Sequence, residues 1–116
     1  MNSVVIVGRV GQDADIRYFE SGKIKTSFSI ASNRWDAKTQ SEVTDWFNVD
    51  VWDKLAEIAG EYVKKGTLLG VEGRIASNKW KDNASGEERE KYFIIANNIR
   101  FLSSKRDDMQ SAENQF

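Results

Sequence analysis

The chain has 116 residues, 40% of them hydrophobic, which is enough for one domain with a buried core and too little for a multidomain protein. It carries 17 Lys and Arg against 18 Asp and Glu, a formal net charge of -1, so its bulk charge does not indicate a polyanionic partner. Because it contains no Cys and no His, disulfides, thiolate or imidazole metal sites, Cys nucleophiles and His general bases are excluded.

Nothing in the sequence indicates a membrane protein or an enzyme. No run of about eighteen apolar residues is present, and the segment after Met1 lacks the parts of a signal peptide, so we expect a cytoplasmic protein. Gly8 and Gly11 resemble a phosphate-binding loop only superficially, because the Lys-Ser/Thr pair of such loops is missing. Catalysis would depend on the carboxylates of residues 13–15 or 87–90, which are typical of solvated loops. We therefore expect no catalytic activity and no cofactor.

The first third of the chain predicts three extended segments. Residues 4–10 are β-branched and almost continuously apolar, which indicates a strand covered on both faces. A short extended piece at residues 16–19 ends in turn residues, and the following strand alternates so that Phe28 and Ile30 face a core. Residues 33–43 are polar and are expected to form a long loop or loose hairpin.

Residues 45–52 alternate strictly, so the strand they predict has two distinct faces. Burying the even-numbered face would trap an amide and a carboxylate without partners, so the odd-numbered face is expected to point to the core. The odd-numbered set is Phe47, Val49 and Val51, and the even-numbered set is Trp46, Asn48, Asp50 and Trp52.

A single helix follows this strand. Asp53 is a plausible N-cap, and Gly66 is expected to end the helix in the left-handed position after its last turn. The apolar residues between them recur at the spacing of one helical face. That predicted face comprises Leu55, Ile58, Ala59, Tyr62 and Val63.

Two long strands complete the expected domain, joined by a charged hairpin over residues 77–90 that turns near Ser85 and Gly86. The first strand places Trp80 on the face opposite its apolar side chains. The positions on that apolar face are Leu69, Val71, Gly73 and Ile75. In the last strand, residues 92–102, the residues expected to share one face are Phe93, Ile95, Ile99 and Phe101.

The order of these elements predicts an all-β domain with one helix inserted after the third long strand. Most connections are too tight for parallel crossovers, and this arrangement is typical of a five-stranded OB-fold barrel with long extended hairpins. The OB-fold domain is expected to span residues 1–102. Residues 103–116 lack periodicity and are expected to form a disordered polar tail.

The four Trp are the main functional signal. They are expected to lie outside the core, where large flat rings indicate a binding surface. Rings interleaved with cations suit a single nucleic-acid strand, because bases stack on the rings while phosphates pair with the cations. A carbohydrate-binding or purely protein-binding OB module is the alternative. The nearby cations are Arg34 beside Trp35, Lys54 two residues after Trp52, and Lys79 and Lys81 flanking Trp80.

These residues carry a family resemblance over about residues 1–102. The stretches are residues 4–13 with Ile16-Arg17-Tyr18, then residues 46–73, then Asn78-Lys79-Trp80. They resemble bacterial single-stranded DNA-binding protein, most of all its short cyanobacterial members. The resemblance implies a homotetrameric, nucleoid-associated OB-fold protein that wraps single-stranded DNA in replication, recombination and repair, with the first strand helping to pair subunits.

The resemblance also implies site residues. Base stacking is implied for Trp35, Trp46, Trp52 and Trp80, and phosphate contacts for Arg17, Arg34, Lys54, Lys65, Arg74 and Lys79. Many family members recruit replication and repair proteins through an acidic C-terminal tip. Here Asp107 and Asp108 lie well before the end, and only Glu113 and Phe116 are similar to that tip, so partner recruitment by residues 103–116 is an expectation from a partial match.

Overall fold

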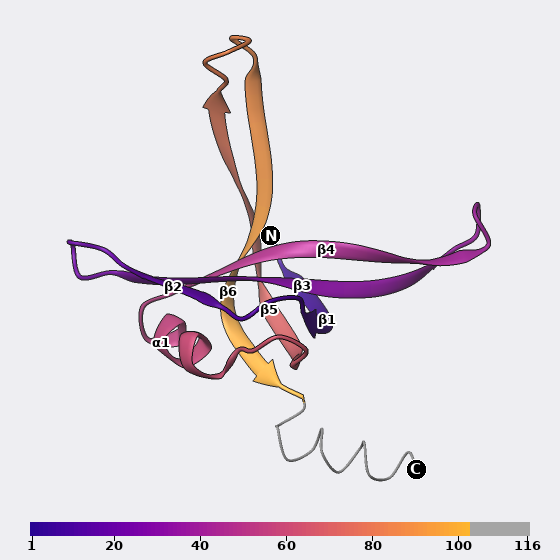
Figure 1. Cartoon of the computed structure of the whole chain (residues 1–116), viewed down its shortest axis with the longest axis horizontal. Coiled ribbons are helices and arrows are strands. Elements are labelled where there is room, and N and C mark those ends of the chain that lie inside the picture. The colour runs from indigo at the N-terminus through magenta and orange to yellow at the C-terminus, as the bar shows by residue number, and fades with distance from the viewer. Residues whose placement is uncertain (103–116) are drawn as a thin grey trace.

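The computed structural model describes residues 1–102, and the tail expected at residues 103–116 lies outside the described residues. Within the described part, six strands and one helix follow one another along the chain (Figure 1). They are β1 (Val4–Val10), β2 (Asp15–Tyr18), β3 (Ile24–Asp36), β4 (Ser41–Trp52), α1 (Asp53–Tyr62), β5 (Leu68–Lys81) and β6 (Glu88–Phe101).

The strands close into a barrel. Their order is β1-β5-β6-β4-β3-β2, and β1 also pairs with β3 through Arg9 opposite Ala31, which closes the sheet. The pairing of β4 with β6 is parallel and joins two residue pairs, Val49 with Ile94 and Asp50 with Ile95; the other pairings are antiparallel. The five long strands form the barrel and β2 adds to the edge of β3, which confirms the predicted OB-fold architecture.

The core fills this barrel from the faces that alternation predicted for β3 and β4. Ile30, Val49 and Val51 are fully buried, and Phe28 is nearly so. From β5, Leu69 and Val71 join them. Burying each such side chain stabilises the fold by about 1.5 to 3 kcal/mol. The even-numbered face of β4 is therefore left outside the core, as expected.

The predicted phase of β6 is wrong for its buried half. Ile94 and Ala96 point to the core there, instead of the odd-numbered residues. Glu72 pairs with Asn98 whereas Gly73 pairs with Ala96, so Asn97 is an extra residue that bulges from the ladder. Because a bulge reverses the alternation, the core-packed Ile99 has the opposite parity from Ala96.

Both predicted ends of the helix are also wrong. Asp53 is the first helical residue, with a positive φ of 57°, and no side chain caps the helix at Trp52. The helix ends at Tyr62, four residues before Gly66. Its buried positions are Ala56 and Ala59, followed by Val63 after its end, whereas the predicted face members Ile58 and Tyr62 are exposed.

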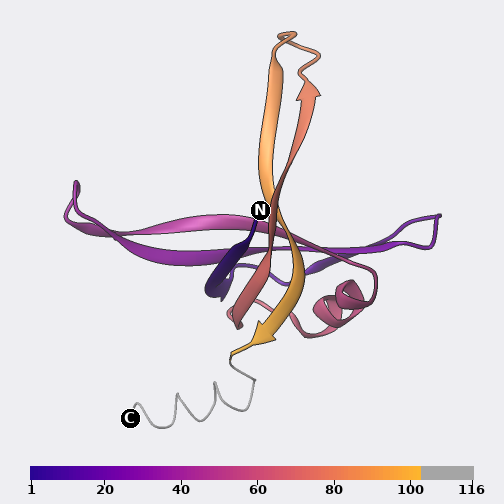
Figure 2. The same cartoon turned by 180° about the vertical axis from the view of Figure 1, so that it is seen from behind.

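Two long hairpins extend from the barrel in different directions (Figures 1 and 2). Of the two expectations for residues 33–43, a long loop or a loose hairpin, the structure has a hairpin, and it is a regular continuation of β3 and β4 that is paired as far as Asp36 opposite Ser41. The predicted hairpin of β5 and β6 is confirmed, with pairing as far as Lys81 opposite Glu88 and a left-handed Gly86 in its turn. We call these hairpins the β3–β4 ribbon and the β5–β6 arm.

The outer face of β1 departs from the expected burial. Val4 and Ile6 pack against the core, but Val5 and Val7 are exposed in the single chain. The strand therefore has one face covered by its own domain and one apolar face exposed.

Among residues 1–102, no helix has the length and apolar character needed to span a membrane.

Candidate nucleic-acid interface

The register of the β3–β4 ribbon gathers three of the four Trp on one face. Lys25 lies opposite Trp52, Ala31 opposite Trp46, and Trp35 opposite Glu42. Since directly opposed residues share a face and alternate residues repeat it, the three rings stand on the same side of the ribbon. We call this side the ribbon face: the odd-numbered residues of β3 from Lys25 to Trp35 and the even-numbered residues of β4 from Glu42 to Trp52.

All four Trp are exposed, as expected. Their exposed fractions are 63% for Trp35, 59% for Trp46, 37% for Trp52 and 50% for Trp80. Large apolar rings held in water at several points along one surface are typical of a binding site.

Trp46 lies close to the backbone of the chain segment after β1. A Cβ atom added to Gly11 would lie 2.5 Å from ring atom Cζ3 of Trp46. The amide nitrogen of Gly11 donates a hydrogen bond of 3.1 Å to the carbonyl of Ser29. The absence of a side chain at Gly11 therefore sets how near the ring lies to the barrel.

Gly11→Ala is expected to displace the Trp46 ring, because the new methyl group would occupy its position. We expect the affinity for single-stranded DNA to fall several-fold while the melting temperature changes little, since an exposed ring can move aside. Titration with an oligonucleotide and thermal unfolding measure the two effects. Unchanged affinity would show that the position of this ring is unimportant for binding.

The β5–β6 arm carries the fourth Trp on a face of its own. Trp80 lies opposite Arg89, Asn78 opposite Lys91, and Ala76 opposite Phe93. We call this the arm face: the even-numbered residues of β5 from Arg74 to Trp80 and the odd-numbered residues of β6 from Arg89 to Ile95. It combines a stacking ring with cations from both strands.

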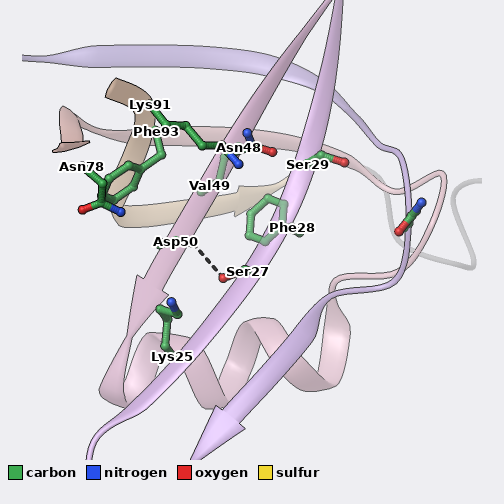
Figure 3. A pocket seen from close by; sticks show the side chains of 11 residues that line it. Lys25, Ser27, Phe28, Ser29, Asn48, Val49, Asp50, Asn78, Lys91 and Phe93 are labelled. Atoms are coloured by element: carbon green, nitrogen blue, oxygen red, sulfur yellow. Dashed lines mark hydrogen bonds between the residues drawn. The ribbon is translucent and has the colours of Figure 1, made fainter. Parts of the chain in front are cut away.

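The ribbon face and the arm face meet in a hollow of about 380 Å³ (Figure 3). Lysines from both sides, Lys25 and Lys91, line it, and Phe93 contributes an aromatic ring. Two further lining residues are bonded to each other: Ser27 donates a hydrogen bond of 2.7 Å to Oδ1 of Asp50. The remaining lining residues are Gln12, Phe28, Ser29, Asn48, Val49 and Asn78. This hollow makes the two faces one continuous surface.

The predicted phosphate-binding residues fall into separate groups. Arg17 lies opposite Lys25, in the same row as Trp52, and is 3.7 Å from the carboxylate of Asp15. Arg74 belongs to the arm face. Lys54 lies in the first turn of α1 and Lys65 between α1 and β5, and both are exposed.

Two predicted cations point away from the Trp beside them. Arg34 pairs with Val43 in the register and forms a 2.7 Å ion pair with Asp45, on the reverse of the ribbon face. Lys79 lies opposite Glu90, on the reverse of the arm face. Neighbouring residues in a strand point to opposite faces, so a cation next to a Trp in the sequence lies on the face of the strand opposite to that ring.

The sequence reasoning did not name the residues that reach these faces from the partner strands. Lys25, Lys91 and Phe93 lie on the same surface as the Trp but far from them in the sequence. Only the register between paired strands brings these residues onto the faces that carry the Trp.

The reverse of the arm face carries a hydrogen-bonded tyrosine. Its partner is the carboxylate of Glu90, and this contact raises the pKa of Tyr92 above its ordinary value of 10.0. Within residues 1–102, no group of three or more acidic side chains is arranged to hold a metal ion.

Comparison with known proteins decides the family. The single-strand binding protein family matches residues 1–102. The chain belongs to this family. Single-stranded DNA-binding protein 1 of Synechocystis sp. is 44% identical over 116 residues, which cover 100% of this chain and 95% of that protein. The single-stranded DNA-binding protein of Thermosynechococcus vestitus is 43% identical over 107 residues, covering 92% and 87%.

A solved structure supports the same assignment. The Plasmodium falciparum SSB complex with ssDNA superposes with a TM-score of 0.79 at 27% identity, covering 89% of this chain and 96% of that one. The predicted resemblance, including its cyanobacterial character, is thereby confirmed for this member of the single-strand binding protein family.

Proposed function

We propose that the chain binds single-stranded DNA without regard to sequence, and wraps and protects it during replication, recombination and repair. The observation that carries the proposal is the arrangement of the exposed rings: three Trp stand on the ribbon face and one on the arm face, and residues of both faces line the hollow between them. Stacking is tolerant of base identity because every base has a π face. The protein acts by binding and catalyses no reaction.

The expected affinity favours a multimeric binder. Stacking contributes about 1 to 3 kcal/mol per base, so four Trp supply roughly 4 to 12 kcal/mol before ordering costs. Micromolar binding requires about 8 kcal/mol. Several domains on one strand raise the affinity through effective concentration, which is the advantage of a homotetramer. The open apolar side of β1, with Val5 and Val7, is a surface that a second copy can cover.

The proposed site of action is the cytoplasm, at the nucleoid.

The balanced charge of the chain fits a protein that binds DNA mainly by stacking. Residues 103–116 contain two of the cations and three of the acids, so residues 1–102 carry no net formal charge. Affinity then depends on cations that lie locally beside the rings.

Oligo(dT) is expected to quench Trp fluorescence strongly, because the bases stack directly on the exposed rings. Added salt should weaken binding, with a shallower dependence than a basic duplex binder displays. Fluorescence titration at several salt concentrations measures both effects, and duplex DNA is the control that should cause little quenching. The mass of the protein with and without the oligonucleotide gives the number of subunits bound.

A flat titration with oligo(dT) at low salt would contradict the proposal. Quenching by oligosaccharides in place of DNA would favour the alternative of a carbohydrate-binding OB module.

A further inference from the structure

The turn between β2 and β3 presents side chains on the same side as Trp52. Arg17 pairs with Lys25 and Tyr18 with Ile24, so the ladder, continued by one step, sets Phe19 opposite Lys23. Two backbone bonds close the turn there: the Phe19 amide donates to the Lys23 carbonyl and the Gly22 amide to the Phe19 carbonyl, each over 2.9 Å. The turn is therefore a defined platform at one end of the ribbon (Figure 1).

Phe19 stacks directly on Trp52. Their ring centroids are 5.9 Å apart and their planes differ by 24°. Phe19 remains 40% exposed and Trp52 37% exposed, so the pair keeps open aromatic surface. Phe19 is not part of the buried core cluster within residues 1–102. The stack therefore holds two rings together at the surface of the molecule.

Two ammonium groups lie over the Trp52 ring. Nζ of Lys23 is 5.9 Å from the centre of the Trp52 ring, and Nζ of Lys25 is 5.8 Å from it. Neither lysine forms an ion pair within residues 1–102. Two like charges held near one ring without a carboxylate repel each other, and an anion bound between them relieves that repulsion.

We propose that Phe19, Lys23 and Lys25 extend the DNA-binding surface beyond Trp52 as a further nucleotide position. One base stacks on the open surface of the Phe19–Trp52 pair, and its phosphate lies near the two ammonium groups. The inference rests on the proposed function and adds contacts that neither the Trp residues nor the family resemblance supplied. The aromatic series then spans the ribbon face from Trp35 to the β2–β3 turn.

Tyr18 provides a matched control. It is an exposed aromatic residue next to Phe19, but it pairs with Ile24 and so lies on the reverse side from Lys25 and Trp52. Replacing Tyr18 removes a similar ring from the same turn without touching the proposed position.

The test measures binding of fluorescein-labelled oligo(dT) by anisotropy for the full chain and its variants. Phe19→Ala is expected to raise the dissociation constant at least about fivefold, the lower limit for loss of one stacked base. Phe19→Leu is expected to weaken binding similarly, because leucine still packs on Trp52 but offers no π face. Tyr18→Ala should stay within about twofold of the wild-type chain, by the same scale.

The lysines are tested through the salt dependence. The double variant Lys23→Gln with Lys25→Gln should reduce the slope of log K against log salt by about 0.7, the value for one phosphate contact on a single strand. Circular dichroism of every variant checks that the fold is kept.

Three results would overturn the inference: wild-type affinity in Phe19→Ala, full rescue by Phe19→Leu, or an equal loss in Tyr18→Ala. Rescue by leucine would show that Phe19 only packs against Trp52. Failure of the wild-type chain to bind oligo(dT) is a separate outcome, which would contradict the proposed function itself.

Discussion

The double variant Trp46→Ala with Trp80→Ala is expected to bind oligo(dT) about 2 to 6 kcal/mol more weakly than the wild-type chain. The two rings stand on different hairpins, one on the ribbon face and one on the arm face, so their contributions should add. Because both rings are exposed, the melting temperature should change little. Anisotropy titrations of the double variant and both single variants measure the sum and the parts.

A double variant with Ile58→Ala and Tyr92→Ala is the control for this result. Both side chains are exposed and apolar, but Ile58 lies on α1 and Tyr92 on the reverse of the arm face. The control should bind as tightly as the wild-type chain. Unfolding of the Trp double variant would show that these rings stabilise the fold, and unchanged binding would remove them from the interface.

Gly73→Ala is expected to be strongly destabilising, at about 3 kcal/mol or more. A Cβ atom at Gly73 would lie 2.1 Å from the carbonyl oxygen of Ile95 and 2.8 Å from Cα of Ala96. Both atoms belong to the backbone beside the Asn97 bulge, so relief requires the β5–β6 ladder itself to shift. Urea unfolding of the two proteins measures the difference in the free energy of unfolding.

Gly70→Ala is the matched substitution in the same strand. The nearest atom to a Cβ at Gly70 is Cδ1 of Leu102 at 3.7 Å, an ordinary contact. We expect its effect on the free energy of unfolding to be below about 1 kcal/mol, since the residue gains strand propensity and meets no clash. Equal stabilities for the two variants would show that the arm tolerates a shifted ladder at Gly73.

Alternation alone predicted the barrel wherever a strand keeps one register and one buried face. Phe28, Ile30, Val49 and Val51 were assigned to the core correctly because nothing interrupts β3 and β4 there. The phase of β6 was wrong because one unpaired residue, Asn97, reverses it, and a bulge has no periodic signal.

The hairpin at residues 33–43 was expected only as an alternative to a loop, and its regular pairing was not predicted, for a different reason. Beyond the barrel a two-stranded ribbon has no buried side, so its sequence need not alternate between apolar and polar residues.

The candidate site was predictable in its rings and less so in its charges. Exposure of the Trp followed from the parity of β4 and the polarity of the hairpins. Which cation shares a face with which ring depends on the partner strand, as Lys25 opposite Trp52 and Arg89 opposite Trp80 illustrate. Pairing between distant strands is non-local, so the local pattern of a single sequence does not predict which residues lie opposite each other.

The position of β6, the last strand in the chain, between β4 and β5 has a consequence for synthesis of the chain. Because β6 lies between β4 and β5 in the barrel, the barrel is not closed until residue 101 has left the ribosome. Until then the growing chain exposes two unsatisfied edges, which can pair with other chains. A transcript truncated before β6 would therefore produce an aggregating fragment, and the last strand decides whether all the preceding ones become a soluble domain.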